Sequence, residues 1–227
     1  MMKEKEKIEH IIFEKNYQPR IERNELILKR INFDKCDSIL DIGCGMGELL
    51  EAIKKKNVRK VGIDNDKKCL KFTKKNAPDA KVIKSNAVKL PFKKNEFDVV
   101  TAVGIVEHVE NPTRVVKESL RVCRKGGQGV FVTPNLGRLS RIFAALRSKE
   151  VYERSGHKQG WDYFLFQRFL ENCGWKVNTI VTRFVDVPFY SYLPKRVAKF
   201  LSYGVFIRLF PKVGSELFAF CEKPIKK

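Results

Sequence analysis

Apolar residues along the chain follow two alternating patterns, one typical of buried strands and one of amphipathic helices. The runs VVTAV at residues 99–103 and GVFVT at residues 129–133 are apolar on both faces, as are strands of a parallel sheet covered by helices. Segments with apolar positions at helical spacing lie between such runs. This alternation predicts βαβ units and therefore an α/β fold on a mostly parallel sheet.

The expected elements follow from these patterns and from their end signals. Asp66 can cap one helix, and Pro112 stands in the first turn of another, where proline is tolerated. Helices are expected at Gly47–Lys56, Asp66–Asn76, Pro112–Cys123 and Asp162–Asn172. Strands are expected at Ser38–Ile42, Lys60–Ile63, Ala80–Lys84, Phe97–Val103, Gly129–Thr133, Trp175–Val185 and Glu216–Cys221.

Three segments fall outside this alternation. Lys3–Ile31 has apolar residues near helical spacing interrupted by Pro19, which predicts two short helices joined at Tyr17–Pro19. Residues 135–160 have the composition of a basic loop, and residues 188–211 interleave aromatic and basic side chains. Such interleaving occurs on surfaces that contact membranes or nucleic acids. An amphipathic cover over the sheet, or a dimer contact, is the more common reason and is expected here.

The chain carries 46 Lys and Arg against 26 Asp and Glu, a net charge of +20. Such a surface attracts polyanions, so the charge points to an anionic membrane surface or RNA as a partner. The lysines are scattered along the whole chain, however, and a merely Lys-rich, solvated surface explains the charge equally well. No sequence feature indicates an obligate protein partner.

Six cysteines occur without a C-x-x-C pair, so neither a disulfide framework nor a zinc site is indicated. Residues 1–9 are dominated by Lys and Glu rather than by the apolar residues of a signal peptide. The apolar run Phe200–Ile207 is far shorter than the ~18 residues of a membrane span. We therefore expect a cytoplasmic protein whose only contact with a membrane would be peripheral.

The segment ILDIGCGMGE at residues 39–48 places Gly43, Gly45 and Gly47 between a strand and a helix. Glycines there let the backbone turn tightly and approach a ligand, because no Cβ stands in the way. A dinucleotide fingerprint G-x-G-x-x-G would need its third glycine at position 48, which is Glu48. A carboxylate there would also repel a pyrophosphate, so the pattern argues against a nicotinamide-dependent oxidoreductase.

The motif D-I-G-C-G-x-G resembles motif I of the class I S-adenosylmethionine-dependent methyltransferases, and the resemblance covers roughly residues 37–135. It implies a doubly wound, Rossmann-like sheet of seven strands with an antiparallel last strand, N-terminal helices and an insertion after the fifth strand. It implies S-adenosylmethionine as cofactor and S-adenosylhomocysteine as product. Asp41 would orient the methionine amino group, and the loop residues would pass the methionine and ribose: Gly43, Cys44, Gly45 and Gly47.

Further cofactor residues follow from the same resemblance. Asp64 ends the second expected strand and would accept the ribose hydroxyls, with Asn65 beside it. Asn86 and Ala87 begin a segment, NAVKLPF, that resembles the family's D-A-x-x-L-P-F segment beside adenine. Asn86 replaces the usual aspartate, and its amide oxygen can still accept a bond from the adenine amine. Two residues after the fourth strand would lie against the cofactor: Gly104 and Ile105.

The segment Glu107-His108-Val109 resembles the E-H-V segment that follows the fourth strand in metabolite methyltransferases. Because His is a natural general base near neutral pH, His108 and Glu107 are candidate catalytic residues. The alternative is that both only brace the start of the next helix. In some quinone-precursor methyltransferases with this segment, acidic and His residues hold a metal. Glu107, His108 and Glu110 are too few to predict such a site, and we expect no metal.

The resemblance places substrate recognition on the N-terminal helices and on the insertion after the fifth strand. Tyr17, His157, Trp161 and Tyr163 are therefore candidates for lining the acceptor pocket, and His157 is also a candidate base. Core packing is the alternative for Trp161, and it is the favoured interpretation for Phe164.

The implied organisation is one methyltransferase domain over residues 1–227. It comprises a helical cap at 1–32, a cofactor-binding half at 33–135, and the substrate-side insertion with the C-terminal strands at 136–227. The implied reaction is methyl transfer to an O, N or C atom of a small-molecule or lipid-linked acceptor. An RNA methyltransferase stays open because of the charge, although no N-P-P-Y-type motif follows the fourth strand. A non-catalytic S-adenosylmethionine-binding scaffold also stays open, supported by Asn86 alone.

Overall fold

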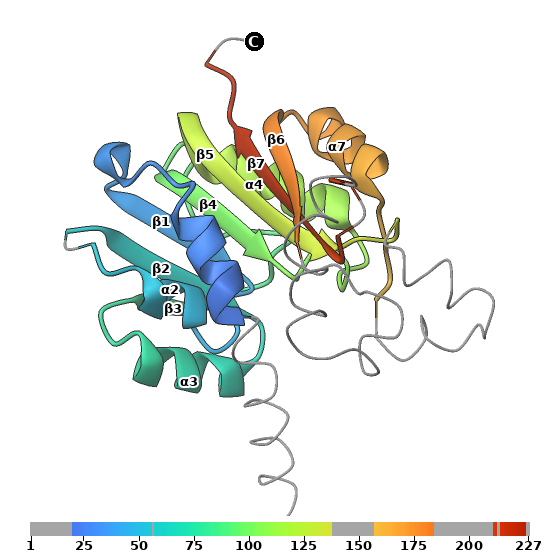
Figure 1. Cartoon of the computed structure of the whole chain (residues 1–227). Coiled ribbons are helices and arrows are strands. Elements are labelled where there is room, and N and C mark those ends of the chain that lie inside the picture. The colour runs from blue at the N-terminus through green and yellow to red at the C-terminus, as the bar shows by residue number, and fades with distance from the viewer. Residues whose placement is uncertain (1–19, 56, 138–156, 184–210, 213, 226–227) are drawn as a thin grey trace, which may run out of the picture.

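A computed structural model describes residues 20–55, 57–137, 157–183, 211–212 and 214–225 (Figure 1). Several sequence predictions lie outside these residues. They are the first N-terminal helix with Tyr17, residues 138–156 of the basic loop predicted at 135–160, and nearly all of the aromatic and basic segment at residues 188–211.

A seven-stranded sheet in the order β3-β2-β1-β4-β5-β7-β6 forms the centre of the fold (Figure 1). β7 runs antiparallel to both of its neighbours, whereas the pairs from β3 through β5 are parallel. The predicted α/β class, with a mostly parallel sheet and an antiparallel last strand, is confirmed. The strands are β1 (Ser38–Ile42), β2 (Arg59–Asp64), β3 (Lys81–Lys84), β4 (Phe97–Val103), β5 (Cys123–Pro134), β6 (Lys176–Arg183) and β7 (Glu216–Glu222).

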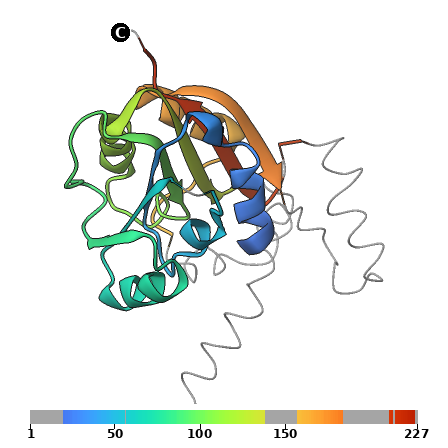
Figure 2. The same cartoon turned by 90° about the vertical axis from the view of Figure 1, so that its left-hand side faces the viewer.

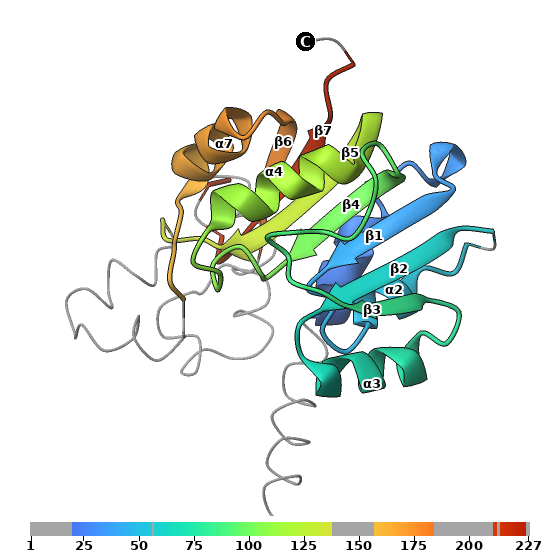
Figure 3. The same cartoon turned by 180° about the vertical axis from the view of Figure 1, so that it is seen from behind.

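Helices cover both faces of this sheet, as Figures 2 and 3 show from the side and from behind. On one face lie α4 (Pro112–Val122) and α7 (Tyr163–Asn172). On the other lie the helix at residues 20–28, α2 (Glu48–Ala52) and α3 (Lys67–Asn76). A single 3-10 turn, η1 (Phe33–Lys35), leads into β1.

Each face of the sheet has its own apolar core, because successive side chains of a strand point to opposite faces. In β1, Leu40 and Ile42 join the core under α4 and α7, whereas Ile39 joins the core under the other helices. β4 divides in the same way, with Val100 facing α4 and Val99 facing the helix at residues 20–28. All of these side chains are fully buried, which explains why both strands carry apolar residues on both faces. Each strand also buries an aspartate, Asp41 in β1 and Asp98 in β4.

Helix starts agree with the capping residues in the sequence. The Asp66 side chain accepts a hydrogen bond from the backbone N–H of Lys68, as predicted for the N-cap of α3. Asn111 caps α4 in the same way, and Pro112 occupies the first turn, where its missing N–H costs nothing. Asp162 caps α7 through the N–H of Leu165.

Two predicted elements differ from the structure by several residues at one end, whereas the other described ends agree to within about one residue. The helix expected at Gly47–Lys56 ends at Ala52, because Ile53 adopts extended backbone angles and its carbonyl oxygen accepts a bond from the Lys60 ammonium. The strand expected at Gly129–Thr133 is longer and begins at Cys123. Its polar first half has no apolar pattern. It pairs with β4 at Cys123, and after a register shift the ladders with β4 and β7 continue from Gln128.

Candidate functional site

The order of the strands creates a crevice between β1 and β4. From β1 the chain moves outward to β2 and β3, then crosses back to continue with β4 and β5 on the other side of β1. Parallel α/β sheets bind ligands at such a reversal, beyond the carboxyl ends of the strands. The glycine loop leaves β1 at this edge, and Gly104 follows β4 beside it.

The backbone of the glycine loop adopts conformations that favour glycine. Gly43, Gly45 and Gly47 have φ angles of 71°, 54° and 85°. A Cβ on Gly43 would lie 2.5 Å from the Ile105 side chain, and one on Gly47 would lie 2.7 Å from Thr73. Among the described residues, a Cβ on Gly45 would meet nothing within 4 Å. Packing therefore constrains the two outer glycines, while no described residue crowds the middle one.

Asp64 fixes the loop from the neighbouring strand. One carboxylate oxygen accepts a bond from the N–H of Gly45 at 3.0 Å, and the other accepts one from the N–H of Asp66 at 2.9 Å. Each carboxylate oxygen can accept a second bond. Asp64 therefore orients the glycine loop and keeps acceptor capacity for hydroxyl groups.

Asp41 lies beneath the loop and is 3% exposed. Its carboxylate accepts a bond from the Thr101 hydroxyl at 2.6 Å. Burial raises the pKa of Asp41 from 3.8 to about 7, against the opposing effects of Thr101 and of the nearby Arg23 guanidinium. A cation beside this carboxylate would stabilise its ionised form.

A cavity of about 260 Å³ brings together most of the predicted cofactor residues and one predicted catalytic residue. Three further lining residues, Ile63, Ser85 and Val109, were not predicted, although each adjoins a predicted residue or motif in the sequence. The predicted residues in its lining are Gly43, Asp64, Asn65, Asn86, Ala87, Gly104, Ile105 and His108.

Two predicted cofactor residues have side chains engaged elsewhere. The Cys44 thiol is buried, which raises its pKa to about 12, and its sulfur lies 3.7 Å from the Thr73 hydroxyl. The amide oxygen of Asn86 accepts a bond from the N–H of Val88 at 3.1 Å. This bond stabilises the turn and occupies one of the two lone pairs of the amide oxygen. One lone pair is left for the adenine amine that the sequence predicts as its partner.

The predicted catalytic residues meet at the end of this cavity. Ligand atoms of Glu107, His108 and His157 all lie within 4.8 Å of one another. The two imidazole rings are in edge contact, with centroids 4.8 Å apart. Two imidazoles and one carboxylate form a donor set that could hold a divalent cation. The sequence did not predict a metal, because His157 lies 49 residues after His108.

Glu107 anchors the segment that carries His157. Its backbone carbonyl oxygen accepts bonds from the N–H groups of Lys158 at 2.8 Å and Gln159 at 3.2 Å. Its side chain is 3% exposed, and burial raises its pKa. The carboxyl oxygen accepts a bond from the Thr133 hydroxyl at 3.3 Å. Glu107 thus links β4, β5 and the histidine segment.

The aromatic residues near this segment differ in their surroundings. Trp161 is 8% exposed and stacks on Phe169 with centroids 5.1 Å apart, so it is part of the core. Tyr163 is half-buried, with the Lys212 ammonium 5.2 Å from its ring centroid. Phe164, expected in the core, is 59% exposed. The prediction for Phe164 is wrong because α7 turns this position away from the sheet.

The helix at residues 20–28 contributes two arginines that the sequence analysis missed. Arg20 forms an ion pair of 2.6 Å with Glu48. Arg23 lies 3.6 Å from Glu216, and its buried Nε has no hydrogen-bond partner among the described residues. Helical spacing predicted a helix in this segment, but not which of its cations approach Asp41.

The methyltransferase domain family matches residues 40–131 of the chain. A ubiquinone biosynthesis O-methyltransferase from Dechloromonas aromatica is 31% identical over 145 residues, 60% of this chain and 61% of that protein. One from Acinetobacter baylyi is 28% identical over 136 residues, 57% of each chain. An uncharacterized protein from Methanocaldococcus jannaschii is 35% identical over 123 residues, 54% of this chain and 46% of that protein. The alignments thus span about three fifths or less of each relative.

Solved structures share the fold over nearly the whole chain. A chain in the complex of the Haloferax volcanii Trm112 methyltransferase activator has a TM-score of 0.70 at 16% identity, covering 95% of this chain and 92% of that one. A SAM-dependent methyltransferase from Archaeoglobus fulgidus has a TM-score of 0.68 at 20% identity, covering 94% of this chain and 99% of that one.

In the described part of the chain, no helix combines the length and hydrophobicity that a membrane crossing requires.

Proposed function

Because the chain belongs to the class I S-adenosylmethionine-dependent methyltransferase superfamily, we propose that it methylates a hydroxyl oxygen of a small-molecule or lipid-linked acceptor. The observation that carries the proposal is the cavity that extends from Asp64 and Asn86 to His108. The named O-methyltransferases among the relatives favour oxygen as the acceptor atom.

The residues around the cavity fit S-adenosylmethionine. Asp64 keeps acceptor capacity for the ribose hydroxyls beyond its bonds to Gly45 and Asp66. The buried Asp41 carboxylate would be stabilised by the amino group of the ligand. Arg23, whose Nε has no partner among the described residues, would meet the ligand's carboxylate.

When bound, S-adenosylmethionine supplies a methyl group on a positively charged sulfur, so catalysis depends chiefly on proximity and orientation. His108 lines the cavity and would take the proton of the acceptor hydroxyl at an imidazole nitrogen. The acceptor oxygen would then receive the methyl group, and its proton would stay on the His108 imidazole. His157 and Glu107 would hold His108 in position and stabilise the imidazolium, since their ligand atoms lie within 4.8 Å of one another.

Calorimetric titration with S-adenosylmethionine, and separately with NADH, tests the cofactor. We expect micromolar-range binding of the first compound alone. Asp64→Ala should weaken it at least about tenfold, because a charge-assisted bond contributes roughly 1.5–3 kcal/mol. Asp34→Ala, an exposed aspartate in η1, is the matched control and should bind normally. Absence of binding to folded protein would overturn the proposal.

Transfer of labelled methyl groups tests the acceptor. Separate reactions contain phenols and catechols, alkyl amines, or total RNA as acceptors. Each reaction is run with the wild-type protein and with the His108→Ala variant. We expect label in the hydroxyl compounds, and a loss of turnover in the variant with cofactor binding retained. Label in RNA would support the RNA methyltransferase alternative. Normal cofactor binding without turnover on any pool would support the non-catalytic scaffold.

A further inference from the structure

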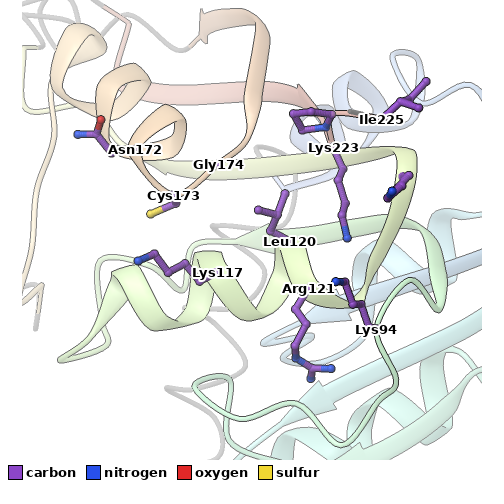
Figure 4. Close-up of a pocket in the computed structure, with 11 residues that line it drawn as sticks. Lys94, Lys117, Leu120, Arg121, Asn172, Cys173, Gly174, Lys223 and Ile225 are labelled. Atoms are coloured by element: carbon purple, nitrogen blue, oxygen red, sulfur yellow. The ribbon is translucent and has the colours of Figure 1, made fainter. Parts of the chain in front are cut away.

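A second cavity, of about 600 Å³, opens at the edge of the sheet opposite the glycine loop. We call it the basic pocket. It lies between the carboxyl-terminal ends of α4 and α7, the start of β5 and the residues that follow β7 (Figure 4). Its lining residues are Lys94, Lys117, Leu120, Arg121, Lys125, Asn172, Cys173, Gly174, Lys223, Pro224 and Ile225.

The basic pocket is separate from the proposed methyl-transfer site. The glycine loop and Gly104 lie beyond the carboxyl ends of β1 and β4, whereas Lys94 precedes β4 and Lys125 lies near the start of β5. The length of β4 separates the two edges, which at ~3.3 Å per residue is roughly 20 Å. The two cavities have no lining residue in common.

Positive charge in the basic pocket is mostly uncompensated. Arg121 is neutralised by Glu118 at 2.8 Å, and its other N–H groups donate to backbone carbonyl oxygens. In the described ranges of the chain, none of the four lysines that line the pocket forms an ion pair with a carboxylate. No acidic residue stands in the lining.

Lys223 is the most unusual of these lysines, because it is only 8% exposed. Its ammonium donates to the amide oxygen of Asn95 and to the carbonyl oxygen of Cys123, both at 2.7 Å. Both acceptors are neutral, and a buried charge without a counter-charge is costly. Burial and the like charges of Lys94 and Lys125 lower the pKa of Lys223. A bound anion would relieve this repulsion.

The remaining lining indicates what accompanies the negative charge. Leu120, Cys173, Pro224 and Ile225 give the pocket an aliphatic side, and no aromatic ring lines it. Nucleic acid bases and nucleotides are usually held by stacking on aromatic rings. Lysines act as point charges for phosphate, and a phosphate carries about two negative charges at neutral pH where a carboxylate carries one.

We propose that the basic pocket binds a phosphate or diphosphate ester of a small aliphatic group. The phosphate would lie among the lysines, and the aliphatic group would contact Leu120 and Ile225. Such an ester occurs both as a soluble metabolite and as a lipid headgroup, and the two sources present the same chemistry to the pocket.

Calorimetry at constant ionic strength tests the proposal. It measures the binding of pyrophosphate and of isopentenyl diphosphate to the full chain. The double variant Lys94→Glu/Lys125→Glu changes two exposed pocket lysines. The double variant Lys71→Glu/Lys74→Glu changes two exposed lysines of α3 and alters the net charge equally. We expect the first variant to weaken both ligands at least about tenfold, since two charge-assisted contacts are lost, and the second to weaken them less than about twofold.

Sedimentation with vesicles containing phosphatidic acid, compared with phosphatidylcholine vesicles, distinguishes the sources. A lipid headgroup is the ligand if the protein binds phosphatidic acid vesicles but not the soluble esters. In that case the pocket variant should lose the vesicle binding and the α3 variant should retain it. Equal losses in the two variants for every ligand would overturn the proposal, because the attraction would then come from the overall charge. Absence of binding to all of these probes would overturn it as well.

Discussion

Protonation of Asp41 should control the affinity for S-adenosylmethionine. The carboxyl group is 3% exposed, and burial raises its pKa to about 7 in the free protein. The ligand's ammonium group favours the ionised carboxylate, so it lowers this pKa when it binds. Binding must therefore release a proton whenever Asp41 is protonated beforehand.

The magnitude follows from the pKa. If only the ionised form binds, the apparent dissociation constant rises tenfold per pH unit well below pH 7 and levels off above it. Between pH 7.5 and pH 6 the affinity should fall about eightfold, and at pH 6 about 0.9 proton should be released per ligand. The ligand's amino group stays mostly protonated in this range, so the change belongs to the protein.

Calorimetry in two buffers of different ionisation enthalpy measures the released protons directly. Asp41→Asn should remove the release while keeping the bond from Thr101, because an amide oxygen also accepts it. His108 lines the same cavity, so the control must be a ligand that enters the cavity without an ammonium group. Adenosine lacks the amino group of the methionine part, so it is the control. Its binding should not depend on Asp41. Equal pH dependence for both ligands would refute the assignment of the amino group to Asp41.

The same pKa has a consequence for stability. A carboxyl group whose pKa is raised by folding stabilises the protein below its unfolded pKa of about 4, and this stabilisation is lost as pH rises to about 7. The largest loss that this shift allows is about 4 kcal/mol. Asp41→Asn should therefore raise the melting temperature of the free protein at pH 8 relative to wild type, and much less at pH 5. If the variant shifts the melting temperature equally at pH 8 and pH 5, the predicted loss of stability with rising pH is contradicted.

Three further predictions concern other parts of the molecule. Gly43→Ala should abolish cofactor binding and lower stability by about 1–3 kcal/mol in denaturant titration, because the new Cβ would lie 2.5 Å from Ile105 at a positive φ. His157→Ala should lower kcat by about 10²-fold with the KM for S-adenosylmethionine unchanged, if it acts with the proposed base; a raised KM alone would point to binding instead. Asp98→Ala should lower stability by about 3–5 kcal/mol with normal m-value, because the buried carboxylate accepts three bonds from the Asp37 and Ser38 region.

Strands were predictable where both of their faces are buried. β1 and β4 have the predicted boundaries at Ser38–Ile42 and Phe97–Val103, because every side chain of β1 and all but the last of β4 are buried. β5 was predicted only in its apolar half. In the other half, Cys123 and Gln128 pair with β4 across a register shift, and Gly126 and Gly127 exchange backbone hydrogen bonds with Lys223. Backbone pairing of this kind leaves no pattern in the side chains.

Orientation around a helix was harder to predict. Trp161 and Phe164 stand three residues apart on either side of the start of α7, and both were candidates for the core. The structure buries Trp161 against Phe166 and Phe169 and exposes Phe164. The direction of a helix relative to the sheet decides which aromatic is covered, and local spacing does not contain that direction.

Contacts between distant segments were the least predictable. His157 and His108 each stood out as candidate bases, yet nothing in their spacing showed that the rings touch. The contact depends on the bonds from Lys158 and Gln159 to the Glu107 carbonyl oxygen. Those bonds form only after β4 and β5 are paired, so the cluster is a property of the tertiary fold.

The ion pair between Arg20 and Glu48 changes one inference drawn from charge. A lone carboxylate at the start of α2 would repel a pyrophosphate, and this repulsion argues against a dinucleotide. Arg20 lies 2.6 Å from Glu48 and compensates much of its charge, so the repulsion is weaker than the sequence implies.

Discrimination between S-adenosylmethionine and a dinucleotide then depends on Asp41, whose buried carboxylate would favour the ammonium group of S-adenosylmethionine. A dinucleotide brings no such cation to this position. The binding comparison with NADH in the Asp41→Asn variant therefore tests the source of selectivity, and weaker S-adenosylmethionine binding without any gain for NADH is the expected result.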